Sequence, residues 1–373
     1  MDVAVNVDVN VAAKESNEHP LTPKEPFIMN QPKPIQLIGS PPSPYTRKML
    51  SILRYRHIPH RMIWGDPGTV LPSLGIAKPK VGLLPTFVMP DEAGELQAVC
   101  DSTPIIRRLE SEYQGRSVIP NDPAMAFIDY LLEDFADEWG TKYMFHYRWQ
   151  AEADADNAGT LLPLFQMVDM PADKLAQFKP FITERQVGRL HVVGSNEVTA
   201  PVIDASYRRL LTALETHLQQ QPYLMGKRPG ASDFALYGQL SQLVGFDPTP
   251  RAITHAISPR AVAYSGLMED QTGIEPADTD WSTAEDAPSS LKGILNEVGR
   301  VYAPALLANA QAMQADEKTW ETEIDGCRWA QQTFKYQGKC LQWINEEYQA
   351  LSKSDRSRVD LLLEGTGCEA IIF

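Results

Sequence analysis

The sequence predicts an α/β domain followed by an α-helical domain and a helical C-terminal extension. Between residues 35 and 115, short apolar runs alternate with segments whose apolar side chains have helical spacing. Beyond residue 120, strand signals largely disappear and helical spacing dominates. The length of 373 residues is enough for two or three domains.

We expect four segments along the chain. The first is an arm without the character of a secretory signal, because it has two early acidic residues and no basic region before an apolar core. The alternation in DVAVNVDVNV leaves an added β-strand as the alternative for this arm. A loop rich in Asp, Pro, Ser and Thr, at 275–290, opens the last segment. The expected boundaries are 1–34 for the arm, 35–115 for the α/β domain, 120–274 for the helical domain and 275–373 for the helical extension.

The charge and the cysteines restrict the class of protein. A formal net charge of -14 argues against nucleic acids and anionic membranes as partners, because both attract basic surfaces. No apolar run approaches the roughly 20 residues of a membrane span. The four cysteines, Cys100, Cys327, Cys340 and Cys368, form no CxxC pair and have no histidine at metal-ligand spacing. We therefore expect reduced thiols in a cytoplasmic protein without a metal site.

The α/β domain is expected to begin with a strand, a helix and a second strand. IQLI, from Ile35, is a short buried strand, and HRMIW, from His60, is the second. A helical crossover between them, over residues 44–56, places the two strands parallel. The apolar stripe of this helix consists of Tyr45, Met49, Ile52 and Leu53.

A hairpin and a second helix complete this domain. TFVM and LQAV flank the turn-rich PDEAGE, so they should pair antiparallel. The helix that follows begins at Asp101–Thr103 and has Pro104 in its first turn. Its apolar stripe consists of Ile105, Ile106, Leu109 and Tyr113. In the helical domain we expect helices over 124–150, 204–221 and 231–245.

The start of the first helix combines good capping residues with positive charge. Ser43 is a good N-cap and Pro44 a good first helical residue. The plain interpretation is a satisfied helix start beside a solvated basic face. Next to a helix N-terminus, however, the same charges favour an anion. Residues 40–65 contain no carboxylate but five cations, Arg47, Lys48, Arg54, Arg56 and Arg61.

Four motifs, in this order, resemble the glutathione transferase superfamily. SPYT, which begins at Ser43, is similar to the serine form of the glutaredoxin Cys-Pro-Tyr-Cys motif, as in theta- and zeta-type transferases. LPTF is similar to the cis-proline segment, and DSTPIIRRLE to the acidic-serine motif and the helix after it. PYLMGKRPGASDFALYGQL is similar to the start of a buried helix, with Asp233 in place but Gly230 where the family has Ser or Thr. The resemblance covers residues 35–270 and implies a thioredoxin-like first domain, an all-α second domain and a homodimer.

The resemblance also implies a site for glutathione as co-substrate. Ser43 would donate a hydrogen bond to the glutathione thiolate, and the helix dipole would add to its stability. The backbone of Leu84, before cis-Pro85, would bind the cysteinyl part like an added strand. Asp101 would bind the ammonium of the γ-glutamyl end, and Ser102 its carboxylate. The implied glutathione-binding residues are Ser43, Tyr45, Leu84, Pro85, Asp101 and Ser102.

The residue types at and near this helix start restrict the reactions that we expect of the site. Without a cysteine at position 43 or 46, disulfide exchange of the glutaredoxin type is not expected. Ser40 is the alternative hydroxyl for the thiolate, and IQLIG contains no tyrosine that would take this role.

The electrophile would bind between the two domains, against the aromatic segment EDFADEWGTKYMFHYRWQ. Trp139, Tyr143 and His146 fall on one helical face and are the expected substrate pocket. The alternative is that this face packs in the core. Arg148, close to it in sequence, would suit an acidic substrate.

These inferences predict a glutathione transferase that attacks a hydrophobic electrophile with a thiolate stabilised by Ser43. A glutathione-dependent lyase or isomerase, for ether cleavage or dehalogenation, is one alternative because it needs the same thiolate. A non-catalytic protein that kept the fold for binding or assembly is the other. The long arm and the extension favour a non-catalytic role, whereas the intact SPYT, LPTF and DST motifs argue against it. The sequence indicates no role for residues 275–373.

Overall fold

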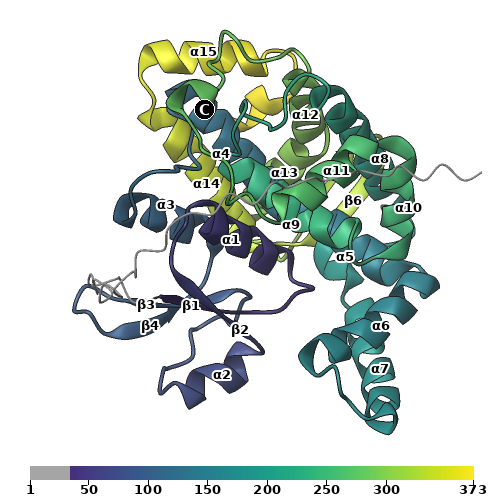
Figure 1. Ribbon diagram of the computed structural model, residues 1–373. Coiled ribbons are helices and arrows are strands. Elements are labelled where there is room, and N and C mark those ends of the chain that lie inside the picture. Colours follow the sequence, from purple (N-terminus) through teal and green to yellow (C-terminus); the bar gives the residue numbers. More distant parts are fainter. Residues whose placement is uncertain (1–33) are drawn as a thin grey trace, which may run out of the picture. The chain divides into compact units, whose positions relative to one another are not determined.

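The first domain has the mixed sheet that the sequence predicts, together with the two predicted helices and a third, short one. Residues 34–373 are described in a computed structural model, so the expected N-terminal arm, apart from Pro34, lies outside the described residues. The elements follow in the order β1 (Ile35–Gly39), α1 (Pro44–Tyr55), β2 (His60–Trp64), α2 (Pro67–Ser73), β3 (Thr86–Pro90), β4 (Leu96–Val99) and α3 (Ser102–Glu112) (Figure 1).

The strand order is β2-β1-β3-β4. Strand β1 pairs with β2 in parallel and with β3 antiparallel, and β3 and β4 form the expected antiparallel hairpin. The short helix α2 occupies a segment that we expected to be an irregular loop. Its Leu71 is fully buried against Ile38 and Val88, so burial of this one side chain holds the turn of helix under the sheet. The arrangement is the thioredoxin-like one.

The second domain is all-α, as expected. Its helices are α4 (Pro123–Glu138), α5 (Gly140–Gln150), α6 (Glu152–Gln166), α7 (Ala172–Val187), α8 (Ala200–His217), α9 (Ala231–Leu243), α10 (Pro248–Ile257) and α11 (Pro259–Met268), with a 3₁₀ turn η1 at Leu190–Val193. The helix predicted over 124–150 is interrupted at Trp139. At this point the carbonyl of Asp137 accepts hydrogen bonds from the hydroxyls of Tyr45 and Thr141, at 2.7 and 2.8 Å. These side-chain bonds lie outside the regular backbone hydrogen-bond pattern of the helix.

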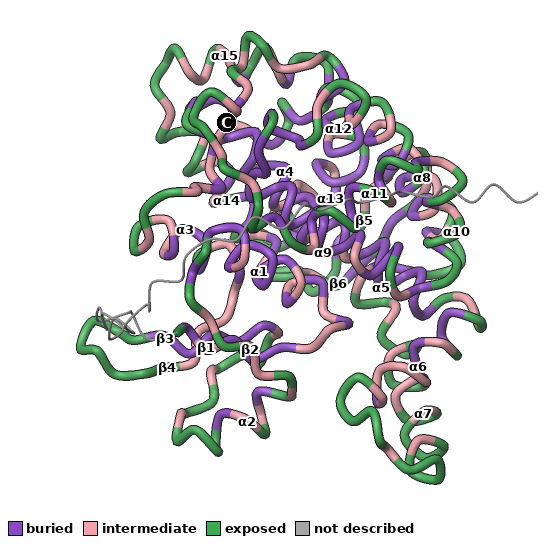
Figure 2. The backbone as a smooth tube through the Cα atoms, viewed as in Figure 1, coloured by how far each residue is buried: buried purple, intermediate pink, exposed green. Residues whose placement is uncertain are grey.

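Helices α4 and α9 form the centre of the core. Figure 2 shows both buried along most of their length, whereas α7 has no buried residue at all. Helix α1 of the first domain packs against α9. A Cβ at Gly238 of α9 would lie 2.6 Å from the carbonyl oxygen of Pro44, so this glycine allows the N-terminus of α1 to approach the second domain closely.

Gly230 stands where the family has Ser or Thr, and the glycine there has a steric reason. A Cβ at this position would clash with the Asp129 carboxylate, so a side chain there would displace Asp129 from its hydrogen bonds to Ser232. Asp233 nevertheless accepts from the Gly230 amide at 2.9 Å and from the Leu224 amide at 2.9 Å, which caps the helix start from the other side. The Ser232 hydroxyl donates to Asp129 and so links α9 to α4.

The C-terminal extension is mainly helical but also contains a β-hairpin that we did not expect. Its elements are η2 (Asp278–Asp280), α12 (Leu291–Glu297), the π-helix η3 (Val298–Tyr302), α13 (Ala303–Gln314), β5 (Thr319–Ile324), β6 (Cys327–Gln332), α14 (Lys335–Ala350), α15 (Lys353–Leu363) and η4 (Cys368–Ile371). The hairpin turns at Asp325 and Gly326, whose φ angles of 51° and 76° suit a two-residue turn. Its Trp329 packs on Trp139 of the second domain, with ring centroids 5.3 Å apart. The extension therefore shares one continuous core with the helical domain.

Candidate active site

Ser43 caps α1 and keeps a free proton. Its Oγ accepts a hydrogen bond from the Thr46 amide at 3.2 Å, with the extended backbone that an N-cap requires. The hydroxyl is half-buried, and within residues 34–373 it donates to no acceptor. The O–H can therefore donate to an anion at the helix N-terminus, where the helix dipole also favours negative charge.

The loop before Ser43 is held by buried side chains of the second domain. The guanidinium of Arg148 donates to the carbonyl of Pro42 at 3.0 Å and also binds Asp247 and Gln242. Gln242 in turn donates to the carbonyl of Pro41 at 3.2 Å. Arg148 is buried and paired, so our expectation that it would meet an acidic substrate was wrong. It acts on the position of Ser43 instead.

Leu84 offers unpaired backbone groups beside this helix start. The Leu84–Pro85 peptide bond is cis. The register pairs Ile38 with Thr86, so residues after β1 lie next to residues before β3, and Leu84 lies beside the loop at Ser40. Among the described residues, neither the amide nor the carbonyl of Leu84 has a hydrogen-bond partner. An extended peptide can pair with this backbone as an added strand does.

Asp101 and Ser102, at the start of α3, both have partners within the protein. Asp101 has a φ of 83°, a conformation that a non-glycine residue adopts only where the surroundings hold it. Both of its carboxylate oxygens accept from the Tyr336 hydroxyl of α14, at 3.0 and 3.0 Å. Ser102 is buried, and its Oγ accepts from the ammonium of Lys48 at 3.3 Å. Among the described residues, polar groups at the thiol end of the expected site thus lack partners, whereas those at its γ-glutamyl end are bonded to side chains.

Comparison with protein families gives two matches that span both domains. Residues 37–117 match the model described as "Glutathione S-transferase, N-terminal domain". Residues 195–269 match the model described as "Glutathione S-transferase, C-terminal domain". This chain belongs to the glutathione S-transferase superfamily. The extension beyond residue 269 lies outside both matches.

Several solved glutathione transferases are similar to this chain at low identity. A glutathione S-transferase from Methylobacterium radiotolerans, in complex with glutathione sulfonate, is 20% identical, with a TM-score of 0.38 over 69% of this chain and 95% of that chain. A glutathione S-transferase from Rhodospirillum rubrum is 14% identical, with a TM-score of 0.39 over 70% and 91%. Poplar glutathione transferase F1 is 16% identical, with a TM-score of 0.37 over 71% and 97%. A search of curated proteins gives no match. The family assignment therefore depends on the two domain models.

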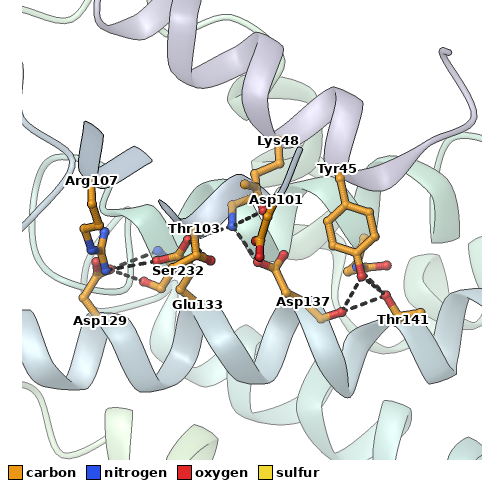
Figure 3. A network of polar contacts seen from close by, with 12 residues as sticks. Tyr45, Lys48, Asp101, Thr103, Arg107, Asp129, Glu133, Asp137, Thr141 and Ser232 are labelled. Atoms are coloured by element: carbon orange, nitrogen blue, oxygen red, sulfur yellow. Dashed lines mark hydrogen bonds and ion pairs between the residues drawn. The ribbon is translucent and has the colours of Figure 1, made fainter. Parts of the chain in front are cut away.

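The two domains of this superfamily member are joined by a buried charge network that the sequence analysis missed. Lys48 of α1 is fully buried and donates to Glu133 at 2.7 Å and to Asp137 at 2.6 Å, both on α4 (Figure 3). Burial alone would lower the Lys48 pKa, but Asp137 and Glu133 raise it above its ordinary value. Burial would raise the Glu133 pKa, but Lys48 and Arg107 hold it below the ordinary value. We had grouped Lys48 with four arginines, either as a solvated basic face or as charges that attract an anion, because sequence alone does not show which side of a basic helix faces another domain.

Tyr45 belongs to the same domain interface. Its hydroxyl donates to the carbonyl of Asp137 at 2.7 Å and lies 2.7 Å from the Thr141 hydroxyl. Burial raises the pKa of Tyr45 well above its ordinary value. The single proton of this hydroxyl is donated to α4, so Tyr45 has no proton left to donate to glutathione.

The three expected pocket residues are in the core. Trp139 and Tyr143 are buried to 0% and 1% exposure, and both lie within hydrogen-bond distance of the Ser206 hydroxyl of α8. His146 pairs with the Ser195 hydroxyl at 2.8 Å, and burial lowers its pKa to about 4. The face of α5 that carries these residues is covered by α8 and by the hairpin of the extension. The alternative of core packing therefore describes this face.

Within residues 34–373, no three His, Cys, Asp or Glu side chains are grouped as metal ligands. In the same residues no helix is both long and apolar enough to cross a membrane. The four cysteines are free thiols, of which Cys340 and Cys368 are buried.

A group of carboxyl groups at the end of α4 makes the stability depend on pH. Burial raises the pKa of Asp134 to about 6, of Asp137 to about 7 and of Glu138 to about 8. In the folded state these groups hold protons that the unfolded chain releases, so stability is lost as the pH rises through these values.

We expect the free energy of unfolding to fall between about pH 6 and about pH 7.5, as measured by urea denaturation. The Glu138→Gln variant removes one of these protons and should flatten the slope. Glu346→Gln, on an exposed residue of α14, is the matched control and should leave the slope as it is. A free energy that rises over this range would contradict the prediction.

Proposed function

We propose that this protein is a cytoplasmic glutathione-dependent transferase in which Ser43 stabilises the glutathione thiolate. The observation that carries the proposal is the Ser43 hydroxyl, which accepts the helix-capping bond and has its proton free at the N-terminus of α1. A free thiol with a pKa near 8.5 is only a few per cent ionised at neutral pH. A hydrogen bond and a helix dipole directed at the sulfur raise that fraction.

The reaction would need little else from the first domain. The Leu84 backbone would hold the cysteinyl part of glutathione, because its amide and carbonyl are unpaired. The thiolate would then attack an electrophilic carbon, a carbon–sulfur bond would form, and the leaving group would depart with its electron pair. Ser43 would keep its proton throughout and would act on the sulfur as a hydrogen-bond donor. The hydrophobic electrophile and the homodimer follow from the family resemblance.

Isothermal calorimetry with reduced glutathione tests the proposal. We expect heat of binding at millimolar ligand or below, and conjugation of an activated chloronitrobenzene that consumes glutathione. Product analysis separates a transferase from a lyase or isomerase, because an isomerase returns free glutathione. No heat at millimolar glutathione would contradict the proposal.

One observation favours a second candidate, a non-catalytic binding or assembly protein. Asp101 and Ser102, which the resemblance assigns to the γ-glutamyl end, are both bonded to side chains of this chain. A protein that no longer binds glutathione has no need to keep these groups free. The same calorimetry decides between the two candidates.

A further inference from the structure

The helix that follows the hairpin places a tyrosine on the expected ammonium-binding carboxylate. Tyr336 lies in the first turn of α14, and its hydroxyl is 3.0 Å from each oxygen of Asp101. Equal distances mean that the hydroxyl lies midway between the two oxygens, which is also the best place for a ligand ammonium. A carboxylate in this state has already exchanged water for a protein donor.

The position of Tyr336 is fixed by the rest of the extension. The buried side chain of Asn309 on α13 forms two hydrogen bonds with the backbone of Phe334, at 2.8 and 3.0 Å. Trp343 contacts the Tyr336 ring at 6.0 Å between centroids. Next to it, the buried Gln337 donates to Glu138 of α4 at 3.3 Å. The first turn of α14 is therefore held in place by contacts with the start of α3 and with α4.

We propose that Tyr336 determines thiol specificity by closing the γ-glutamyl end of the site. The inference rests on the proposed function, because it concerns the same glutathione site. To bind, the ammonium of glutathione must displace the Tyr336 hydroxyl from Asp101. The exchange is feasible because a charged donor bonds more strongly than a neutral one, but glutathione gains only the difference between the two. A thiol without a γ-glutamyl group binds at Ser43 and Leu84 and leaves Tyr336 in place.

The experiment compares two thiols on three proteins by calorimetry. Glutathione has the γ-glutamyl group, and cysteinylglycine has the same cysteinyl and glycyl parts without it. Tyr336→Phe removes only the hydroxyl. Tyr348→Phe is the matched control, since Tyr348 lies on the same helix and its hydroxyl donates to Asp360 at 2.6 Å, away from Asp101.

We expect Tyr336→Phe to bind glutathione about ten-fold more tightly than the wild type, because a hydrogen bond to a charged group no longer has to be exchanged. Binding of cysteinylglycine should not change, and Tyr348→Phe should behave as the wild type with both thiols. Unchanged or weaker glutathione binding by Tyr336→Phe, with wild-type binding intact, overturns the specificity role. Weaker binding would instead make Tyr336 a ligand-binding residue. Absence of binding of either thiol to all three proteins overturns the proposed function itself, and this inference with it.

Hydrogen exchange provides a second readout that does not depend on affinity. If glutathione displaces Tyr336, the amides of α14 after Phe334 should exchange faster in the glutathione complex than in the free protein. Cysteinylglycine should leave them unchanged. Slower exchange of these amides with glutathione would contradict displacement.

Discussion

Replacing Lys48 by methionine should destabilise the protein by about 3–5 kcal/mol, which is the largest effect that we expect from a single substitution. Lys48 is the one cation within hydrogen-bond distance of both Glu133 and Asp137 among the described residues. Methionine fills a similar volume but leaves Asp137 without a cation and Glu133 with Arg107 alone. The cost is that of an uncompensated buried charge, which exceeds the net contribution of the ion pair itself.

Chemical denaturation measures this loss, and two variants control it. Arg47→Met removes the neighbouring cation, whose ion pair with Glu269 is partly exposed, and should cost about 1 kcal/mol or less. Adding Glu133→Gln to Lys48→Met removes one stranded charge and should recover part of the loss. A loss below about 1 kcal/mol for Lys48→Met would mean that water reaches the network.

Replacing Ser43 by alanine should lower kcat/KM for conjugation by about ten- to a hundred-fold. A hydrogen bond to a charged group contributes roughly 1.5–3 kcal/mol, and the transition state retains part of the thiolate charge. The ultraviolet absorbance of the bound thiolate, followed against pH, should show the pKa of the glutathione thiol returning toward its free value near 8.5.

The same substitution also removes the cap of α1, so stability must be measured beside activity. Loss of an N-cap costs about 1 kcal/mol and does not by itself change the pKa of a bound thiol. Ser40→Ala is the matched control, because Ser40 was the alternative hydroxyl in the same loop. If Ser40→Ala raises the pKa of the bound thiol and Ser43→Ala does not, then Ser40 is the hydroxyl that stabilises the thiolate. Undiminished activity of Ser43→Ala would contradict the proposed mechanism.

Local sequence patterns were sufficient to predict much of the secondary structure of the first domain. The strand at Ile35, the capped helix from Pro44 and the hairpin around PDEAGE were all predicted, because each depends on residues close together in the sequence. The helix at α2 was missed, since this short segment buries only Pro67 and Leu71 and so has no helical stripe of apolar residues. The hairpin of the extension was also missed, although Asp325-Gly326 between alternating buried and exposed residues was a usable signal.

The sequence by itself determined the order of elements, the position of Ser43 at a helix start and the family motifs, because capping, periodicity and turn chemistry act over a few residues. Only the tertiary structure decided which polar groups meet across long separations. It put Lys48 against α4, Arg148 under the Pro42 loop and Tyr336 on Asp101, 235 residues apart in the chain. Such contacts depend on how helices pack against one another, and no local pattern encodes which side chain of a distant segment will fill a given space.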